Sequence, residues 1–352
     1  MKIKAVAENS IERLVLAAGW APTPILDTLH ALLFARVVMA GAKLGVFEAL
    51  AAAPRTAAEV AADIGTDAPA TGKLLDALVG VSYLRFSGGR YALARVARRW
   101  LLKGGRWSLH DNMLHRYLEW QAAEHLEEFV RSGRPLDVHA QMTPDMWATY
   151  QRGMRSLANI VAPEITRRMP VPRDASDMID IGGGHGCFAV ALCRRHPGLR
   201  ATVLDLPAAI EQASTFPVDE DVRDRIVYRA GDALADDLGT ERWDLVLMSQ
   251  LVHHFDELAN RELMRRVAQA LRPGGIVAVL DLFRPSSPGA AGQSGALLDV
   301  FYAVTSRSGT WPWQDIADWQ RQAGLRPRRP IRLITVPGAG IQAAVKPVTN
   351  SA

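Results

Sequence analysis

The second half of the chain alternates short apolar segments with helical ones. Strands are predicted at 178–181, 201–204, 226–230, 245–248 and 276–280, and helices between them at 188–195, 208–215 and 260–271. Because connections of this length join parallel strands through helices, the pattern predicts a parallel sheet with helices on both faces. The tail predicts a hairpin with strands at 331–336 and 341–345, which adds antiparallel strands.

The N-terminal part follows a mainly helical pattern. A helix is predicted over 27–50, where Leu29, Leu32, Leu33, Val37 and Val38 recur at three- and four-residue steps. Apolar residues occupy so many faces of this helix that a small N-terminal domain can hardly cover them. We therefore expect a partner chain to cover the rest.

The next segment has the order of a winged helix. Thr56 and Glu59 form a capping box before a helix at 57–64, and a second helix is predicted at 70–79. Two short alternating strands, 83–86 and 90–93, flank a turn at 87–89. No acidic residue lies between Asp76 and Asp111, whereas seven cations do: Arg85, Arg90, Arg95, Arg98, Arg99, Lys103 and Arg106.

A largely helical stretch, 109–168, is broken at 132–135, and 171–174 has the composition of a hinge. These boundaries predict an N-terminal winged-helix domain at 1–104, a helical linker at 105–172 and a nucleotide-binding domain at 173–352. Trp147, Tyr150 and Met154 lie at helical steps in the linker. A buried core stripe and the wall of a binding pocket both fit that spacing.

Composition excludes several classes of protein. Hydrophobic residues make up 49% and charged residues 22% of the chain, as in ordinary globular proteins. Two cysteines six residues apart suit neither a disulfide framework nor a metal site, which favours a reducing cytoplasm and no bound metal. Charges interrupt the N-terminal apolar segment, so we expect no signal peptide. The longest apolar stretches, such as 31–42, contain Arg36 and fall short of the roughly 20 residues of a membrane span, so we expect no such span.

The strongest motif follows the first strand of the predicted sheet. In the run Asp180-Ile-Gly182-Gly-Gly184-His-Gly186, alternate glycines let the backbone turn tightly and approach a ligand closely. A dinucleotide-binding loop would place its last glycine at Cys187. Asp180 would repel a pyrophosphate but favour the cationic amino-acid portion of S-adenosyl-L-methionine, which we therefore expect as the cofactor.

Acidic residues also end the next two strands. Asp205 ends the second, where a carboxylate can accept both ribose hydroxyls, and Gly231-Asp232-Ala233 ends the third, where Asp232 can accept from the adenine amine. The alternative is that these are only turn residues of another doubly wound protein.

These motifs, together with Leu204-Asp205-Leu206-Pro207 and Leu271-Arg-Pro-Gly-Gly275, resemble the dimeric class I small-molecule O-methyltransferases, the family of plant caffeate-type and bacterial natural-product tailoring enzymes. The resemblance covers about residues 25–348. It implies a mainly α winged-helix dimerisation region followed by an α/β Rossmann-like methyltransferase domain, with a mostly parallel sheet and an antiparallel C-terminal hairpin.

The resemblance also implies roles for particular residues. The cofactor site would comprise Asp180, Gly182, Gly184, Asp205, Leu206, Gly231, Asp232, Ala233, Ser249 and Gln250. The N-terminal domain would form a homodimer whose helices help to close the partner's pocket for a small-molecule acceptor. Candidate acceptor residues are His115, Trp147, Tyr150, Met154, His254, Phe301 and Tyr302. Their aromatic character favours a flat, mostly apolar acceptor.

A histidine after the fourth strand is the catalytic base implied by the resemblance, and His253 aligns with it. A histidine suits the removal of a phenol or enol proton near neutral pH. His254 replaces the aspartate that typically follows. Asp281 aligns with one orienting acid, and Asp315 lies close to the place of a second. The alternative is that His253 lines the pocket in an enzyme that uses no base.

Two other functions also fit the sequence. A methyltransferase of the same fold can act on carbon, nitrogen or sulfur. A second class is a DNA-binding regulator that senses a nucleotide-like ligand, which the winged helix and its basic residues favour. Against it, the second helix of the winged segment carries Lys73 and Asp76 instead of base-reading side chains. We therefore expect no specific binding to nucleic acid. His110, His125 and His139 are interpreted as packing or surface residues.

Overall fold

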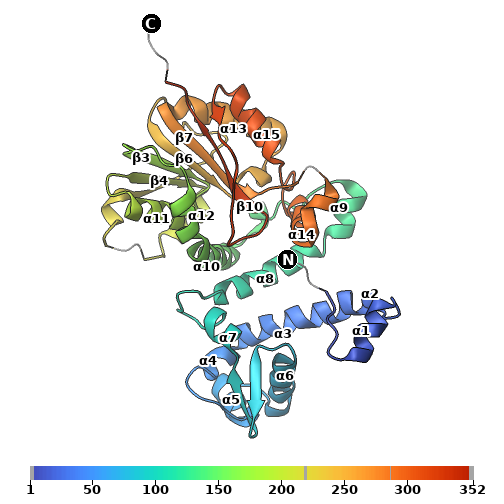
Figure 1. Ribbon diagram of the computed structural model, residues 1–352. Helices are drawn as coiled ribbons and strands as arrows, with labels where there is room; N and C mark the ends of the chain where they lie inside the picture. The colour runs from blue at the N-terminus through green and yellow to red at the C-terminus, as the bar shows by residue number, and fades with distance from the viewer. Residues whose placement is uncertain (1–3, 218–219, 286, 349–352) are drawn as a thin grey trace. The chain divides into compact units, whose positions relative to one another are not determined.

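The computed structural model describes residues 4–217, 220–285 and 287–348 (Figure 1). The described chain divides into two compact units, residues 4–117 and residues 118–348. The division falls inside α8 (His110–Ala123), which begins in the first unit and ends in the second. The boundaries expected near residues 104 and 172 stay predictions.

The N-terminal unit has the expected winged-helix order. Its elements after residue 50 are α5 (Ala57–Ile64), α6 (Ala68–Gly80), β1 (Leu84–Ser87), β2 (Arg90–Leu93) and α7 (Arg95–Trp100). The capping box is present, since the Glu59 N–H donates to Thr56 Oγ1 and the Thr56 N–H donates to the Glu59 carboxylate. Gly88 and Gly89 both have positive φ, which the tight turn between twisted strands requires.

The first long helix differs from the predicted 27–50. It runs without interruption from Thr23 to Leu44 as α2 (Thr23–Ile25), η1 (Leu26–His30) and α3 (Ala31–Leu44), after α1 (Ser10–Ala17). Gly45, with φ of 82°, ends it, and α4 (Val46–Ala49) follows. Val38, Met39 and Ala42 are buried in the core of this unit, whereas Leu29, Leu32, Leu33 and Phe34 are 45–53% exposed.

This segment is also longer than the apolar stretch apparent in the sequence. By length and composition alone, Thr23–Leu44 is sufficient to cross a membrane, although the same test is passed by core helices and signal sequences.

The C-terminal unit contains the predicted sheet. Its strands are β3 (Asp177–Ile181), β4 (Arg200–Asp205), β5 (Ile226–Ala230), β6 (Trp243–Ser249), β7 (Leu271–Leu282), β8 (Arg326–Pro327), β9 (Ile331–Arg332) and β10 (Ala339–Val345). Their order is β5-β4-β3-β6-β7-β10-β8, with β9 also pairing with β10. The pairs from β5 to β7 are parallel and those of β10 are antiparallel. The predicted class, with its mostly parallel sheet and antiparallel C-terminal strands, is confirmed.

Helices cover both faces of this sheet (Figure 1). The helices of the unit are α9 (Leu126–Ser132), α10 (Pro144–Arg168), α11 (Cys187–Arg195), α12 (Pro207–Ala213), α13 (Glu257–Ala270), α14 (Pro288–Thr305) and α15 (Trp313–Gln322), with short turns η2 (His139–Gln141), η3 (Arg223–Arg225) and η4 (Val252–His254). Residues of α10 and α11 pack in one core cluster, and residues of α13 and α15 pack in the other. In β3, Met178 belongs to the first cluster and Ile179 and Ile181 belong to the second, as in a strand buried on both faces.

The tail departs from the predicted hairpin. Its first strand, β9, has two residues instead of six, and β10 begins at Ala339 inside the expected turn. The reason is a carboxylate on α10. Glu164 accepts the backbone N–H groups of Ile334 and Thr335, both at 2.8 Å, so these groups do not continue the ladder with β10.

The interruption in the helical stretch 109–168 is longer than the predicted break at 132–135. Gly133, with φ of 68°, ends α9, and α10 begins only at Pro144, capped by Thr143. Between them, the Leu136 N–H donates to Val304 O and thus joins the interruption to α14. The bounds of α14 and α15 were not apparent from the sequence.

Candidate active site

The carboxyl ends of the parallel strands gather the polar residues of the site. The register pairs Ile181 with both Leu204 and Met248, so the glycine loop, Asp205 and Ser249 emerge side by side. Asp205 pairs with Ala230, directly before Gly231, and Ser249 pairs with Leu280, directly before Asp281. Residues up to about a hundred positions apart in sequence therefore lie along one edge of the sheet.

The glycine loop is tied to the end of β4. The Gly184 N–H donates to Asp205 Oδ2, and the Leu206 N–H donates to Asp205 Oδ1, both at 2.7 Å. Gly182, Gly184 and Gly186 have φ of 70°, 46° and 69°, which only glycine adopts without strain. Burial raises the pKa of Asp205 to about 6, although its two backbone donors act in the opposite direction.

Two buried polar side chains flank this loop. Asp180, from β3, is fully buried, and neither of its carboxyl oxygens makes a hydrogen bond of normal geometry with the described residues. Burial, followed by the charge of Asp205, raises the pKa of Asp180 to about 8, against a smaller effect of the Ala189 N–H. Gln151, from α10, is 2% exposed, and its Oε1 is likewise without a partner among the described residues.

Asp232, which follows the third strand of the parallel sheet, contacts residues close to it in sequence. The Leu234 N–H donates to Asp232 Oδ1, and the Asp232 N–H donates to Asp236 Oδ2. Asp232 is exposed and Ala233 is half-buried, and the carbonyl of Ala233 accepts from Arg266. Beyond β6, Ser249 is buried, and Gln250 has φ of 52° while its N–H donates to Leu280 O.

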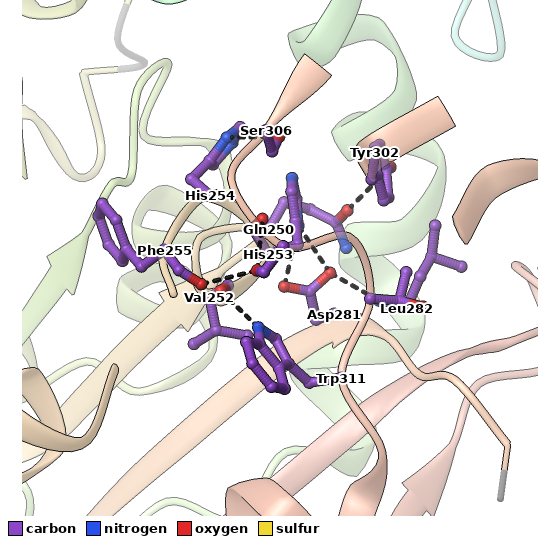
Figure 2. Close-up of polar contacts among 12 residues, drawn as sticks. Gln250, Val252, His253, His254, Phe255, Asp281, Leu282, Tyr302, Ser306 and Trp311 are labelled. Atoms are coloured by element: carbon purple, nitrogen blue, oxygen red, sulfur yellow. Dashed lines mark hydrogen bonds and ion pairs between the residues drawn. The ribbon is translucent and has the colours of Figure 1, made fainter. Parts of the chain in front are cut away.

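His253, in the turn η4, and Asp281, near the end of β7, form a hydrogen-bonded pair. His253 Nδ1 lies 3.0 Å and 3.1 Å from the two carboxyl oxygens of Asp281, and both side chains are buried (Figure 2). Asp281 Oδ1 also accepts the Leu282 N–H at 2.7 Å. Since a carboxylate only accepts hydrogen bonds, His253 Nδ1 carries a hydrogen, and in the neutral ring Nε2 carries the lone pair.

The segment 306–311 holds the backbone of this turn. Ser308 Oγ donates to Phe255 O at 2.7 Å and to His253 O at 3.3 Å. Trp311 Nε1 donates to Val252 O at 3.0 Å (Figure 2). From α13, Asn260 Nδ2 donates to the carbonyls of Val252 and Phe255. The orientation of His253 therefore depends on three separate parts of the unit.

The comparison with protein families decides the class. Residues 121–324 match the model of the O-methyltransferase domain, and residues 26–103 match that of the O-methyltransferase dimerisation domain. The chain belongs to the O-methyltransferase family. It is an S-adenosylmethionine-dependent methyltransferase, as the glycine loop and Asp205 predicted.

Relatives of this methyltransferase include enzymes named as O-methyltransferases and as an N,N-dimethyltransferase. A 3-hydroxy-5-methyl-1-naphthoate 3-O-methyltransferase of Streptomyces sahachiroi is 28% identical over 92% of this chain and 95% of its own. The N,N-dimethyltransferase OxyT of Streptomyces rimosus is 26% identical over 89% and 93%. Human N-acetylserotonin methyltransferase, solved in complex with S-adenosylmethionine, shares the fold with a TM-score of 0.80 at 20% identity, over 98% of this chain and 100% of the other.

The predicted acceptor residues of the methyltransferase fall into two groups. Trp147 and Tyr150 contact each other and the ring of His139, and His139 in turn lies 4.8 Å from the ring of His254. Tyr302 stacks on His253 and neighbours Phe301. Met154 is half-buried on α10, one helical turn beyond Tyr150. His115 is buried in the other compact unit.

The structure also identifies residues that sequence reasoning overlooked. His139, interpreted as a packing or surface residue, lies among Trp147, Tyr150 and His254, and Ser306 Oγ lies 3.1 Å from His254 Nδ1. No local sequence signal links Ser306 to a residue 52 positions away. Asp315 does not pair with His253 in the described hydrogen bonds. Burial raises the pKa of Asp315, and the charge of Arg284 acts in the opposite direction.

Proposed function

We propose that this methyltransferase methylates the hydroxyl oxygen of a small aromatic or polyketide-like acceptor in secondary metabolism, with His253 as general base. The observation that carries the proposal is the buried hydrogen bond between His253 Nδ1 and Asp281. It leaves Nε2 of His253 as the proton acceptor. A Streptomyces relative named as a naphthoate 3-O-methyltransferase supports an aromatic acceptor.

His253 makes the acceptor oxygen a better nucleophile. Bound S-adenosylmethionine supplies a methyl carbon attached to a positively charged sulfur. His253 Nε2 would take the acceptor's hydroxyl proton as the oxygen attacks the methyl group, and the methyl donor would leave as a neutral thioether. Asp281 stabilises the imidazolium that forms and keeps the ring in the required tautomer.

The residues at the sheet edge fit the cofactor. Asp205 uses each carboxyl oxygen once for a backbone N–H and keeps acceptor capacity for two ribose hydroxyls. The carboxyl oxygens of Asp180 and Oε1 of Gln151 are buried acceptors without a hydrogen bond of normal geometry among the described residues, and a cationic amino-acid portion beside Gly184 would donate to them. Asp232 would accept from the adenine amine, and Gly182, Leu206, Gly231, Ala233, Ser249 and Gln250 would line the remainder.

The acceptor would bind between the aromatic residues of α10 and those at the end of α14. Trp147, Tyr150 and His254 lie on one continuous chain of ring contacts with His139, and Phe301 and Tyr302 extend from His253. Such surfaces suit a flat ring system. Met154 and His115 stay predicted acceptor-binding residues, on the basis of the sequence alone.

The active form would be a homodimer through the N-terminal unit. Residues 26–103 match a dimerisation domain, and exposed Leu29, Leu32, Leu33 and Phe34 offer an apolar face for it. Two of the basic side chains there have local partners, since Arg90 pairs with Glu59 and Arg98 donates to Ala51 O, which supports the prediction of no specific nucleic-acid partner. The expectations of no membrane partner and a cytoplasmic location stay predictions from the sequence.

Methyl transfer by proximity alone is the second candidate, favoured by the relative named as an N,N-dimethyltransferase. The test compares His253→Ala with the wild type on a phenol that is protonated at the assay pH. A base role predicts turnover lower by roughly 10²–10⁴-fold, with S-adenosylhomocysteine affinity nearly unchanged. Turnover within a few-fold of wild type would instead support proximity.

A further inference from the structure

Two imidazole rings stand next to each other on the turn η4. The ring centroids of His253 and His254 are 4.2 Å apart, with their planes at 46°. The described hydrogen bonds use Nδ1 of each ring, with Asp281 for His253 and Ser306 for His254 (Figure 2). In the part of the chain that the structure describes, Nε2 of each ring is left for a ligand.

The partner of each Nδ1 determines what its Nε2 can do. Asp281 accepts from His253, so Nε2 of His253 is an acceptor. Ser306 is 6% exposed, and the described hydrogen bond of its hydroxyl is the one with His254 Nδ1 at 3.1 Å. A buried hydroxyl hydrogen needs an acceptor, so Ser306 donates to Nδ1 and Nε2 of His254 carries a hydrogen. The adjacent rings therefore have opposite hydrogen-bonding character.

His254 stays neutral in this environment. Burial, followed by the neighbouring His253 and His139, holds the pKa of His254 well below its ordinary value. Its Nε2–H is therefore a fixed donor instead of an acid that titrates near neutral pH. An aspartate, which the family resemblance predicts at this position, would only accept hydrogen bonds.

We propose that the acceptor carries a carbonyl oxygen adjacent to the hydroxyl that is methylated, as in an ortho-hydroxy aryl ketone or a hydroxyquinone. The hydroxyl donates to His253 Nε2, and the carbonyl accepts from His254 Nε2–H. This inference rests on the proposed role of His253 as the base. The aromatic rings of Trp147, Tyr150 and His139 continue from His254 and suit the flat body of such a molecule.

The Nε2–H donor of His254 would make the acceptor's hydroxyl proton more available to His253. In an ortho-hydroxy ketone, the hydroxyl donates internally to its own carbonyl across roughly 2.5–3.0 Å, which makes its proton less available. His254 competes for the carbonyl and releases the hydroxyl to donate to His253. An acceptor without an adjacent carbonyl would leave the half-buried Nε2–H of His254 without a partner.

The test uses two hydroxyacetonaphthone isomers, one with the hydroxyl adjacent to the acetyl group and one with it remote. We expect wild-type kcat/KM to favour the adjacent isomer by about 5- to 100-fold, the range for a buried group left unpaired. The affinity of both isomers for the S-adenosylhomocysteine complex, measured by calorimetry, should show the same order. The internal hydrogen bond makes the adjacent isomer the weaker acid, so intrinsic acidity works against this result.

Variants separate the inference from the proposed function. His254→Phe keeps a ring but removes the donor, and should bring the isomer ratio close to one. Ser306→Ala should reduce the ratio, because Nδ1 of His254 loses its donor and the hydrogen is no longer fixed on Nε2. Ser214→Ala changes an exposed serine directly after α12 and should leave the ratio unchanged. His253→Ala should abolish most turnover but keep the preference in binding.

An equal or inverted isomer preference in the wild type, or an unchanged ratio in His254→Phe, would overturn the inference while leaving methylation of hydroxyls intact. If the enzyme binds S-adenosylhomocysteine but methylates neither isomer nor any other phenol, the proposed function fails and the inference fails with it.

Discussion

Tyr302 lies flat against His253, with ring centroids 4.3 Å apart and planes within 5° of parallel. The Tyr302 hydroxyl donates to Gln250 Oε1 at 3.4 Å, which connects α14 to the end of β6. Stacking on one face and the Asp281 hydrogen bond at one edge leave the ring little freedom to rotate. The imidazole is therefore held ready for proton transfer before an acceptor binds.

Asp281→Asn should lower turnover by about tenfold to a hundredfold, less than the roughly 10²–10⁴-fold loss expected for His253→Ala. An asparagine amide can also donate to Nδ1, which would favour the tautomer with hydrogen on Nε2 and remove the base. Steady-state kinetics at saturating acceptor measures the effect, and the loss should shrink for acceptors already ionised at the assay pH. Wild-type turnover in a folded Asp281→Asn protein would contradict the orienting role.

Asp205→Ala should weaken S-adenosylhomocysteine binding by about 1.5–3 kcal/mol, the range for hydrogen bonds to a charged group. The mutation also frees the Gly184 and Leu206 N–H groups, which Asp205 now holds. Calorimetry measures the affinity. Asp221→Ala is the matched control, because this exposed carboxylate pairs only with Arg194 at the surface among its described ion pairs. Equal affinities in the two variants would refute the ribose assignment.

Asp180 should couple cofactor binding to pH. Burial and the charge of Asp205 raise its pKa to about 8, so it is mostly protonated at neutral pH in the free protein. A cationic amino-acid portion favours the carboxylate, so binding should release a proton, and affinity should rise between about pH 6 and about pH 7.5. Calorimetry in buffers of different ionisation enthalpy measures this release, which Asp180→Asn should diminish.

The raised pKa of Asp180 also affects the stability of the folded protein. A carboxyl whose pKa is higher in the folded than in the unfolded state reduces stability as pH rises from the unfolded value towards the folded one. Asp180→Asn should therefore raise the melting temperature of the ligand-free protein at neutral pH while weakening cofactor binding. A lower melting temperature at neutral pH would show that the carboxyl has a stabilising partner.

Glu164→Gln should destabilise the C-terminal unit at neutral pH. Burial raises the pKa of Glu164, but hydrogen bonds from Thr335, Ile334 and Arg168 outweigh it and bring the pKa to about 2. The folded pKa is below the unfolded value, so this stabilisation, about 3 kcal/mol, is present above about pH 4.5 and lost as pH falls towards 2. Urea unfolding at several pH values should show the two proteins converging in acid, and a constant difference would contradict this account.

The exposed face of α3 should govern association. Leu33→Glu places a charge among apolar residues, and we expect it to shift the protein towards monomer at low micromolar concentration, as measured by light scattering. Val227→Glu is the control, because Val227 is 60% exposed on β5 in the other unit. A wild-type protein that is monomeric and fully active would rule out the homodimer.

The strand pattern was predictable because each strand carries its own signal. Residues 178–181 are apolar except for Asp180, Asp205 ends the next strand, and Asp232 follows the third. Since parallel strands bring their carboxyl ends to one edge, the cofactor candidates were expected to converge without any knowledge of contacts. The capping box at Thr56 was equally readable, since both of its members lie within one helical turn.

Other features depended on contacts between distant segments. Glu164 shortened β9 by binding Ile334 and Thr335 from 170 residues away, and nothing in the tail itself indicates this. Ser306 and His139 joined His254 through loops that have no periodic pattern. Local sequence determined the elements and the edge at which polar groups gather, because propensity and burial act within a few residues. Only the tertiary structure decided that Asp281 and not Asp315 meets His253, and which nitrogen of each histidine is left for an acceptor, because hydrogen-bond partners depend on distances that the packing of separate elements sets.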